Sequence, residues 1–265
     1  MIYLQYYLHT HPHTHTHTHT HTRASLNAWI ISLAIDAADQ AKHHCPKCAY
    51  TCRSLSAVQK IIQQFIGVLD HGRGYTVYRR LPCVQKGANL TLSILLDLIC
   101  RGHLRGKSKL YMQWDGASEN VAKTNLRFFI WLLLACESKD LPLETIVVCR
   151  LLVGHTHFDV DQRHSVLARY ILGRLGIQDR GRRKLHSLSA FKKCVQEAHD
   201  DLETFSECTK NYDFDQWLAC MENKLEIGLP THLQYELKRA GNGVILSRSK
   251  PRMSEHIAWS KWEKI

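Results

Sequence analysis

The sequence predicts an α/β fold built on a mixed sheet, and three observations carry that prediction. Short apolar, β-branched runs of strand length alternate with longer segments that have helical spacing. Three strand-like segments come first, before any helix, which indicates antiparallel pairing. Each later strand is followed by a helix, which is typical of parallel strands joined by crossovers. The hydrophobic fraction of 45% is sufficient for a sizeable core.

The first half of this core is predicted to contain three strands. The segment Trp29 to Asp36 is typical of a buried strand, and it ends in an acid. A second apolar run, Ile61 to Leu69, leads through the turn Asp70 to Gly74 into Tyr75 to Leu81, which alternates as a strand does. The last two runs therefore predict an antiparallel hairpin.

Helices and strands alternate in the second half of the core. Leucine spacing predicts a helix over Asn89 to Leu104, and Lys109 to Asp115 is a strand that again ends in an acid. A largely buried helix is predicted over Asn120 to Cys136 and a strand over Thr145 to Val153. A last core helix follows, with one apolar face formed by Val160, His164, Leu167 and Ile171.

The resulting order, β-β-β-α-β-α-β-α, is the element order of the ribonuclease H-like fold. Right-handed crossovers in such a fold bring the ends of the first and fourth strands together. We assign residues 26–175 to this ribonuclease H-like core. Residues 1–25 are expected to be disordered, because His9 to Thr22 alternate His and Thr and offer no apolar face. An in-frame CA dinucleotide repeat encodes that pattern, so this stretch is interpretable as a microsatellite.

Residues 176–265 differ in character and are predicted to form a C-terminal α+β appendage. Amphipathic helices are expected over Ser187 to Cys208 and over Asp213 to Glu226. Leu233 to Arg239 and Val244 to Arg248 predict a hairpin around Ala-Gly-Asn-Gly. A final strand is expected within Ile257 to Ile265.

Composition predicts the class of partner. The formal charge of +11 favours an anionic partner, with DNA first and RNA second, although a merely basic surface would give the same number. The longest apolar run, Phe128 to Cys136, is shorter than the roughly 20 residues that span a bilayer, so no membrane partner is expected. The start of the chain lacks a signal peptide pattern, and the ten scattered cysteines favour free thiols in a reducing compartment, nuclear or cytoplasmic.

Acids at the ends of predicted elements indicate a metal site. Asp36 and Asp115 end two strands, and Asp159 or Asp161 opens the last core helix. Two divalent ions about 4 Å apart can polarise a phosphate, activate a nucleophile and stabilise the leaving oxygen. Mg²⁺ or Mn²⁺ would take such oxygen ligands. We expect Asp36 to bridge two ions, Asp115 to hold one, and the third acid to hold the other.

Two aspartates compete for the third position. Asp159 and Gln162 match a capping box, which gives Asp159 a structural reason to be there. Asp161 has no evident capping role, so we favour Asp161 as the metal ligand and keep Asp159 as a catalytic candidate. His164 shares the face of Asp161 but lies on the apolar stripe, which favours a core histidine.

Further polar residues surround these acids in the sequence. His155 and His157 alternate, so one would contact substrate or orient a carboxylate while the other packs. Asp39 would support the site from behind the ligands, with capping of the turn that leads to Lys42 as the alternative. Glu119 and Asn120 would position water or substrate, with simple decoration of a helix N-terminus as the alternative. The cysteines and histidines of His43 to Cys52 give a weaker zinc candidate, because no second ligand pair follows them.

Three motifs in this order resemble an uncharacterised eukaryotic domain family associated with transposable elements. They are Ile35 to Lys42, Trp114 to Asn120 and Gly154 to Asp161. The resemblance covers roughly Ile30 to Leu175 and extends through the tail to Ile265. It implies an integrase- or transposase-like core of the ribonuclease H type, with acidic ligands at Asp36, Asp115 and either Asp159 or Asp161. The family pattern has Gly-Met where Ala37 and Ala38 stand, and Asn where Gly116 stands; neither difference removes a carboxylate.

The sequence therefore predicts a transposon-derived nuclease or strand transferase of the DDE type, dependent on Mg²⁺ or Mn²⁺. The alternative is a catalytically inactive relic that binds nucleic acid or protein through its basic surface. Target sequence and oligomeric state are not encoded in any pattern that we recognise.

Overall fold

The computed structural model describes residues 29–38, 44–45, 47–48, 61–115, 122–136, 141–150, 159–175, 184–185, 187–224, 234–251 and 258–264. The His-Thr repeat, and with it the disorder predicted for residues 1–25, lies outside these residues. The chain divides into two compact units. Unit 1 comprises residues 1–33, 87–153 and 212–265, and unit 2 comprises residues 34–86 and 154–211. Each unit is described by itself.

Unit 2 is organised around the predicted hairpin, which the structure confirms. Strand β5 (Gln64–Asp70) pairs antiparallel with β6 (Gly74–Arg80), with Asp70 opposite Gly74. Strand β1 (Ile30–Ala37) ends in this unit, where the Ala38 amide donates to the Phe65 carbonyl at 2.9 Å.

Four two-residue strands make separate pairs in unit 2. Strand β2 (His44–Cys45) pairs with β4 (Ile61–Ile62), and β3 (Lys47–Cys48) pairs with β9 (Lys184–Leu185).

One element of unit 2 corrects the sequence analysis. The helix expected over Ser187 to Cys208 ends early, as α7 (Leu188–Ala198), and Leu202–Cys208 forms strand β10. The chain leaves the helix at His199, which has extended backbone angles. Strand β10 then pairs in parallel with the edge of β6. Its backbone hydrogen bonds therefore come from a partner distant in sequence, which local helical spacing cannot reveal.

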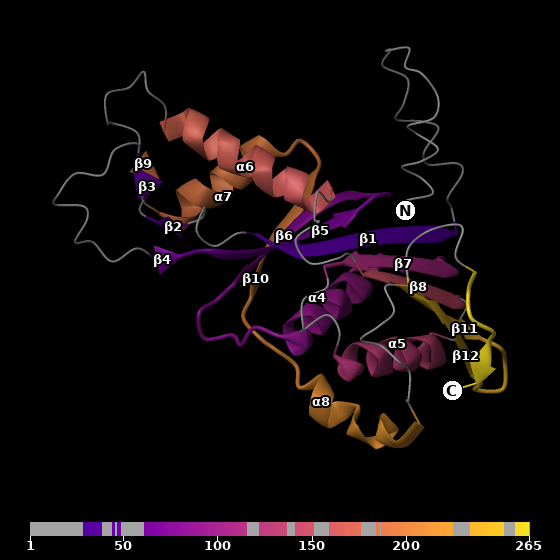
Figure 1. The fold of residues 1–265 in the computed structure, drawn as a ribbon. Coiled ribbons are helices and arrows are strands. Elements are labelled where there is room, and N and C mark those ends of the chain that lie inside the picture. Colours follow the sequence, from indigo (N-terminus) through magenta and orange to yellow (C-terminus); the bar gives the residue numbers. More distant parts are fainter. Residues whose placement is uncertain are drawn as a thin grey trace, which may run out of the picture. The chain divides into compact units, whose positions relative to one another are not determined.

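Helices α6 (Asp159–Leu175) and α7 pack against each other in unit 2 (Figure 1). They cover one face of β5, on which Phe65 and Gly67 alternate with outward residues. The Phe65 ring stacks on Phe191 of α7 with centroids 4.5 Å apart. A Cβ on Gly67 would lie 2.8 Å from Val160 and 2.9 Å from His164, so the missing side chain admits the start of α6.

Unit 1 contains parallel and antiparallel strands. Strand β7 (Lys109–Trp114) runs parallel to β8 (Thr145–Arg150), and β8 pairs antiparallel with β11 (Gln234–Arg239). Strand β12 (Ile245–Lys250) returns from β11 through Gly241, Asn242 and Gly243, all with positive φ, which confirms the predicted hairpin. Of the strand expected within Ile257 to Ile265, the described part contains the two-residue β13 (Glu263–Lys264).

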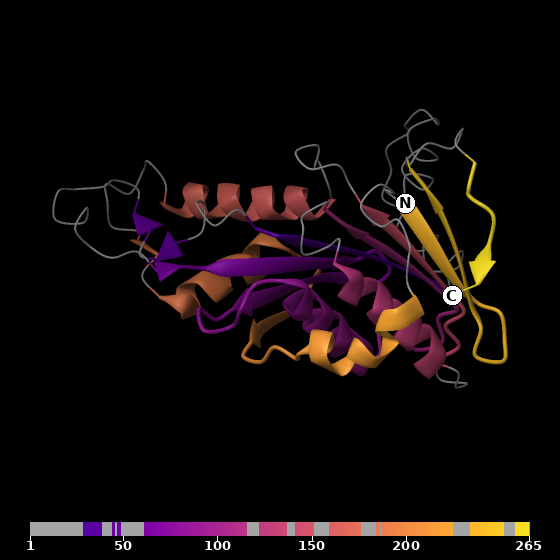
Figure 2. The ribbon, with the colours of Figure 1, turned by 60° about the horizontal axis from the view of Figure 1, so that its bottom comes forward.

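Helices α4 (Ala88–Cys100) and α5 (Lys123–Ala135) pack side by side in unit 1, as both ribbon views show (Figures 1 and 2). Helix α5 lies against β8 and β11. The helix expected over Asp213 to Glu226 is shorter, with one turn of α8 (Phe214–Trp217) and a 3₁₀ helix at Ala219–Lys224.

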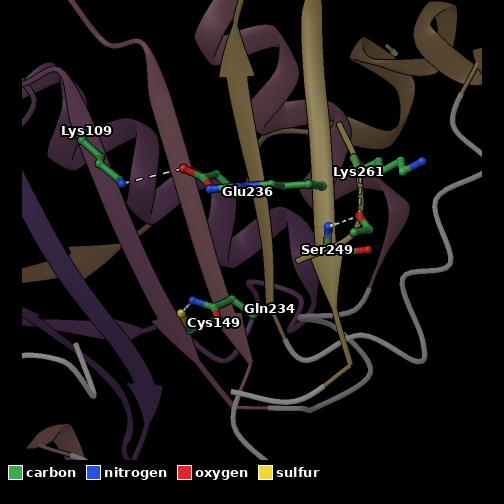
Figure 3. A network of polar contacts seen from close by, with 8 residues as sticks. Lys109, Cys149, Gln234, Glu236, Ser249 and Lys261 are labelled. Atoms are coloured by element: carbon green, nitrogen blue, oxygen red, sulfur yellow. Dashed lines mark hydrogen bonds and ion pairs between the residues drawn. The ribbon is translucent and has the colours of Figure 1, made fainter. Parts of the chain in front are cut away.

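The opposite face of the unit 1 strands carries a polar network (Figure 3). The Glu236 carboxylate is almost fully buried and lies 3.7 Å from Lys109 Nζ. The same carboxylate accepts a hydrogen bond from Arg248 Nε at 2.7 Å and forms an ion pair with Arg248 Nη2 at 2.5 Å. The Arg248 guanidinium also stacks on the rings of Trp259 and Trp262, at 4.8 and 4.5 Å. This network ties β7, β11 and β12 together.

Among the described residues, nine strands form one mixed sheet and five segments are α-helices, which confirms the predicted α/β class. The hydrogen-bonded order of the strands is β10-β6-β5-β1-β7-β8-β11-β12-β13. The residues of β1 divide between the units after Leu33.

Candidate functional site

Helix α6 begins with two aspartates that flank its buried stripe. The stripe is the predicted one and consists of Val160, His164, Leu167 and Ile171, all buried. Successive residues of an α-helix are about 100° apart, so Asp159 and Asp161 differ by about 200° around the axis. Their carboxylates therefore face different neighbours.

The Asp159 side of α6 faces the β5–β6 turn. Asp159 Oδ2 lies 2.9 Å from His71 Nε2, and both side chains are 27% exposed. One turn along the same side, Arg163 donates to both oxygens of Asp201, at 2.8 and 2.6 Å. Asp201 directly precedes β10, so this side of the helix is anchored toward β6 and β10. The carboxylate of Asp159 is therefore already engaged with an imidazole.

His164 connects the helix to the end of β1. Its Nε2 lies 3.4 Å from the carbonyl oxygen of Asp36, and its Nδ1 lies 3.2 Å from the Tyr75 hydroxyl. A carbonyl oxygen only accepts, so Nε2 carries the hydrogen and Nδ1 accepts from Tyr75. Burial raises the pKa of Tyr75 well above its usual range, which keeps this hydroxyl a donor. The prediction of a core histidine is confirmed, since His164 is 8% exposed.

Asp161 projects on the other side of α6. It lies away from the contacts that Asp159 and Arg163 make with the β5–β6 turn and with Asp201. Asp161 Oδ2 is buried and has no hydrogen-bond partner among the residues that the structure describes. Burying an ionised carboxylate oxygen without a donor costs several kcal/mol unless a cation compensates. Asp161 is therefore a residue that could hold a hard divalent ion through this oxygen.

Asp36 is the penultimate residue of β1 and is half-buried. Its Oδ1 accepts from the amide of Ala37 at 2.8 Å, and its carbonyl faces His164. The contact with His164 places the end of β1 beside the second turn of α6. Asp36 and Asp161 thus belong to one neighbourhood of unit 2.

Asp115 belongs to unit 1, where it directly follows β7 and is half-buried. The predicted convergence of Asp115 with Asp36 and Asp161 stays a prediction. Within the described parts of the chain, no three His, Cys, Asp or Glu side chains group closely enough to hold a metal ion.

Several predicted site residues lie outside the described residues. They are Asp39, Glu119, Asn120, His155 and His157, together with the side chains of the zinc candidate within His43 to Cys52. The roles proposed for them, and the weaker place given to zinc, stay predictions. The described cysteines are free thiols, as the sequence analysis expected: Cys83, Cys100, Cys136, Cys149, Cys194, Cys208 and Cys220.

Two basic residues of the described strands have acidic partners. Arg79 donates to Glu207 at 3.0 Å, and Lys109 lies 3.7 Å from Glu236. Their charges are therefore partly neutralised within the protein, which weakens them as phosphate contacts.

The structure also places one functional candidate that the sequence analysis missed. His71 was considered only as part of a turn, yet its imidazole contacts Asp159, which lies 88 positions away in the chain. The only local signal for a role of His71 was its place in a glycine-rich turn between two strands.

Fold and site together define an α/β domain in which an acidic helix start faces the end of a sheet strand. The chain belongs to the family described as a domain of unknown function (DUF7869), which matches residues 53–253. Asp115, Asp159, Asp161 and His71 lie within the matched residues, and Asp36 lies before them. No curated protein and no solved structure matches the chain. None of the described helices has the length and apolar character needed to cross a membrane.

Proposed function

We propose that this chain is a ribonuclease H-like core that cleaves or joins nucleic-acid phosphodiesters with divalent cations, and that it derives from a transposable element. Strand order supports the fold. Its five core strands are, in chain order, β1, β5, β6, β7 and β8. In the sheet they lie in the order β6-β5-β1-β7-β8, so the third strand of the chain comes first, followed by the second, first, fourth and fifth. The second and third are antiparallel, the fourth and fifth are parallel, and helices α4 and α5 follow the third and fourth.

The observation that carries the proposed chemistry is the buried Oδ2 of Asp161, for which the described part of the chain offers no hydrogen-bond partner. Asp161 would hold the cation together with Asp36, because His164 links the second turn of α6 to Asp36. Mg²⁺ or Mn²⁺ suits this donor set, since hard cations prefer carboxylate oxygens. When bound, the ions would stabilise charge on the phosphate and lower the pKa of a bound water.

Asp115 is the proposed third carboxylate. Within unit 1, the Ser108 and Lys109 amides donate to the Trp29 carbonyl at 2.9 and 3.2 Å. The start of β7 is therefore level with the residue that precedes β1. We propose this role because Asp115, like Asp36, ends an apolar strand-like run in the sequence.

Nucleic acid is the proposed substrate because of charge. The formal charge of +11 would attract a phosphodiester backbone, and the attraction should weaken as salt rises. DNA is the first candidate and RNA the second.

A binding-only relic is the second candidate function. It is favoured by the finding that no group of three ligand-type side chains occurs among the described residues. Such a protein would bind nucleic acid with the same salt dependence but would leave the phosphodiester bonds intact.

A nicking assay on supercoiled DNA separates the two candidates. The full chain is incubated with Mn²⁺ or Mg²⁺ beside Asp161→Asn, Asp115→Asn and the control Asp97→Asn. Asp97 is a suitable control because it is half-exposed and pairs with Arg101 on α4. The His-Thr repeat is present in every variant, so any chelation by it cancels. Nicking by the wild type and the control, lost in the two site variants, supports the enzyme. Salt-sensitive binding by all four proteins with no nicking supports the relic.

A further inference from the structure

We propose that His71 is a positioning residue of the metal site, which acts by holding Asp159 and so fixing the rotation of helix α6. This inference rests on the proposed function. It gives the two aspartates different roles: Asp161 binds the cation, and Asp159 is the acceptor by which the helix is held.

The contact itself is well placed for this role. His71 Nε2 lies 2.9 Å from Asp159 Oδ2, a distance typical of a strong hydrogen bond to a carboxylate. The turn that carries His71 is ordered by its own bonds, because Asp70 Oδ1 accepts from the Gly72 amide at 2.9 Å and the Asp70 carbonyl accepts from Arg73 at 3.1 Å. The imidazole is therefore presented from a rigid turn.

Helix starts fray, because their first amides lack intrahelical acceptors. Arg163 and His164 anchor the second turn of α6, through Asp201 and Tyr75. In the first turn, Val160 packs over Gly67 and fixes how deep the helix lies. The hydrogen bond between His71 and Asp159 lies on one side of that turn, so it restrains rotation of the helix about its axis. Because Asp161 is about 200° away from Asp159 around the same helix axis, this restraint also fixes the direction of the Asp161 side chain.

The two roles make different chemical demands. An acceptor at position 159 can be an amide oxygen, so Asp159→Asn should preserve the contact with His71. A cation ligand at position 161 needs the carboxylate charge, so Asp161→Asn should not be tolerated. Likewise His71→Gln keeps an N–H donor, whereas His71→Ala removes it.

Mn²⁺ affinity measured by electron paramagnetic resonance titration tests this division on the full chain, without any need for catalysis. Asp161→Asn should weaken the site by roughly a hundredfold or more. His71→Ala and Asp159→Ala should each weaken it by about tenfold, the lower range for residues that orient a metal ligand. Asp159→Asn and His71→Gln should stay within about threefold of the wild type. Circular dichroism establishes that each variant is folded.

Two results would overturn the inference. One is a loss of Mn²⁺ affinity in Asp159→Asn as large as the loss in Asp161→Asn, which would make Asp159 a metal ligand. The other is wild-type affinity in His71→Ala. A wild type with no Mn²⁺ site sensitive to Asp161→Asn would instead refute the proposed function. The contact would then still be tested by urea unfolding, where His71→Ala and Asp159→Ala should shift the midpoint non-additively.

Discussion

Lowering the pH from about 7.5 to about 4.5 is expected to destabilise unit 2 through His199. This imidazole is 2% exposed and packs edge-on against the Tyr75 ring, with centroids 4.8 Å apart. Neither of its ring nitrogens has a hydrogen-bond partner among the described residues. Burial, with the nearby Arg163 guanidinium, lowers the pKa of His199 from 6.5 to about 4, against the opposing effect of Asp201 and Asp200.

The sign follows from proton binding. In the unfolded chain His199 titrates near 6.5, so between pH 6.5 and 4 the unfolded state binds a proton that the folded state does not. The contribution of His199 to the free energy of unfolding is therefore fully present above pH 6.5. It falls by about 1.4 kcal/mol for each pH unit between 6.5 and 4. At pH 4.5 the loss from this one group is roughly 2.5 kcal/mol.

The assay compares the wild type with His199→Leu at both pH values. All six tryptophans belong to unit 1, so tryptophan fluorescence reports on that unit and amide hydrogen exchange in β6 and β10 reports on unit 2. The loss of unit 2 stability between the two pH values should be about 2.5 kcal/mol smaller in His199→Leu, because the other titrating groups are common to both proteins. Equal losses in the two proteins would refute the reasoning.

The remaining predictions concern packing and buried charge. Gly67→Ala should destabilise unit 2 by about 1–3 kcal/mol, since the new Cβ would lie 2.5 Å from the Tyr75 hydroxyl oxygen. Gly173 is instead an exposed residue of α6 with nothing within 4 Å of a new Cβ, so Gly173→Ala should stabilise by about 0.5–1 kcal/mol. Hydrogen exchange that ranks the two variants alike would contradict this. Glu236→Ala should destabilise unit 1 by roughly 3 kcal/mol, because Arg248 and Lys109 lose their shared buried carboxylate. Urea unfolding followed by tryptophan fluorescence measures it, and an unchanged midpoint would show that the network contributes nothing.

Much of the fold could be predicted because its signals are local. The hairpin of β5 and β6 follows from two apolar runs around Asp70 to Gly74, and α6 follows from a stripe of four apolar-face residues. The error at Leu202–Cys208 has a non-local cause. That segment becomes a strand because the edge of β6 offers it hydrogen bonds, and β6 lies more than a hundred residues earlier.

The candidate site divides in the same way. Spacing alone favoured Asp161 over Asp159, because only Asp159 has a capping role to explain it. The structure adds a physical reason, since Asp159 contacts His71 while Asp161 keeps a buried oxygen without a described partner. No local pattern encodes that contact, because His71 and Asp159 come together only when the hairpin turn meets the helix start.

The most direct test of the shared cation is backbone cleavage by iron. Fe²⁺ in place of Mg²⁺, with ascorbate and peroxide, generates hydroxyl radicals that cut the chain close to the ion. We expect cuts next to Asp36, Asp115 and Asp161 in the same protein. Excess Mg²⁺ should suppress them, and they should be absent from Asp161→Asn. Cuts confined to the His-Thr repeat, or cuts beside Asp161 without any beside Asp115, would contradict this expectation.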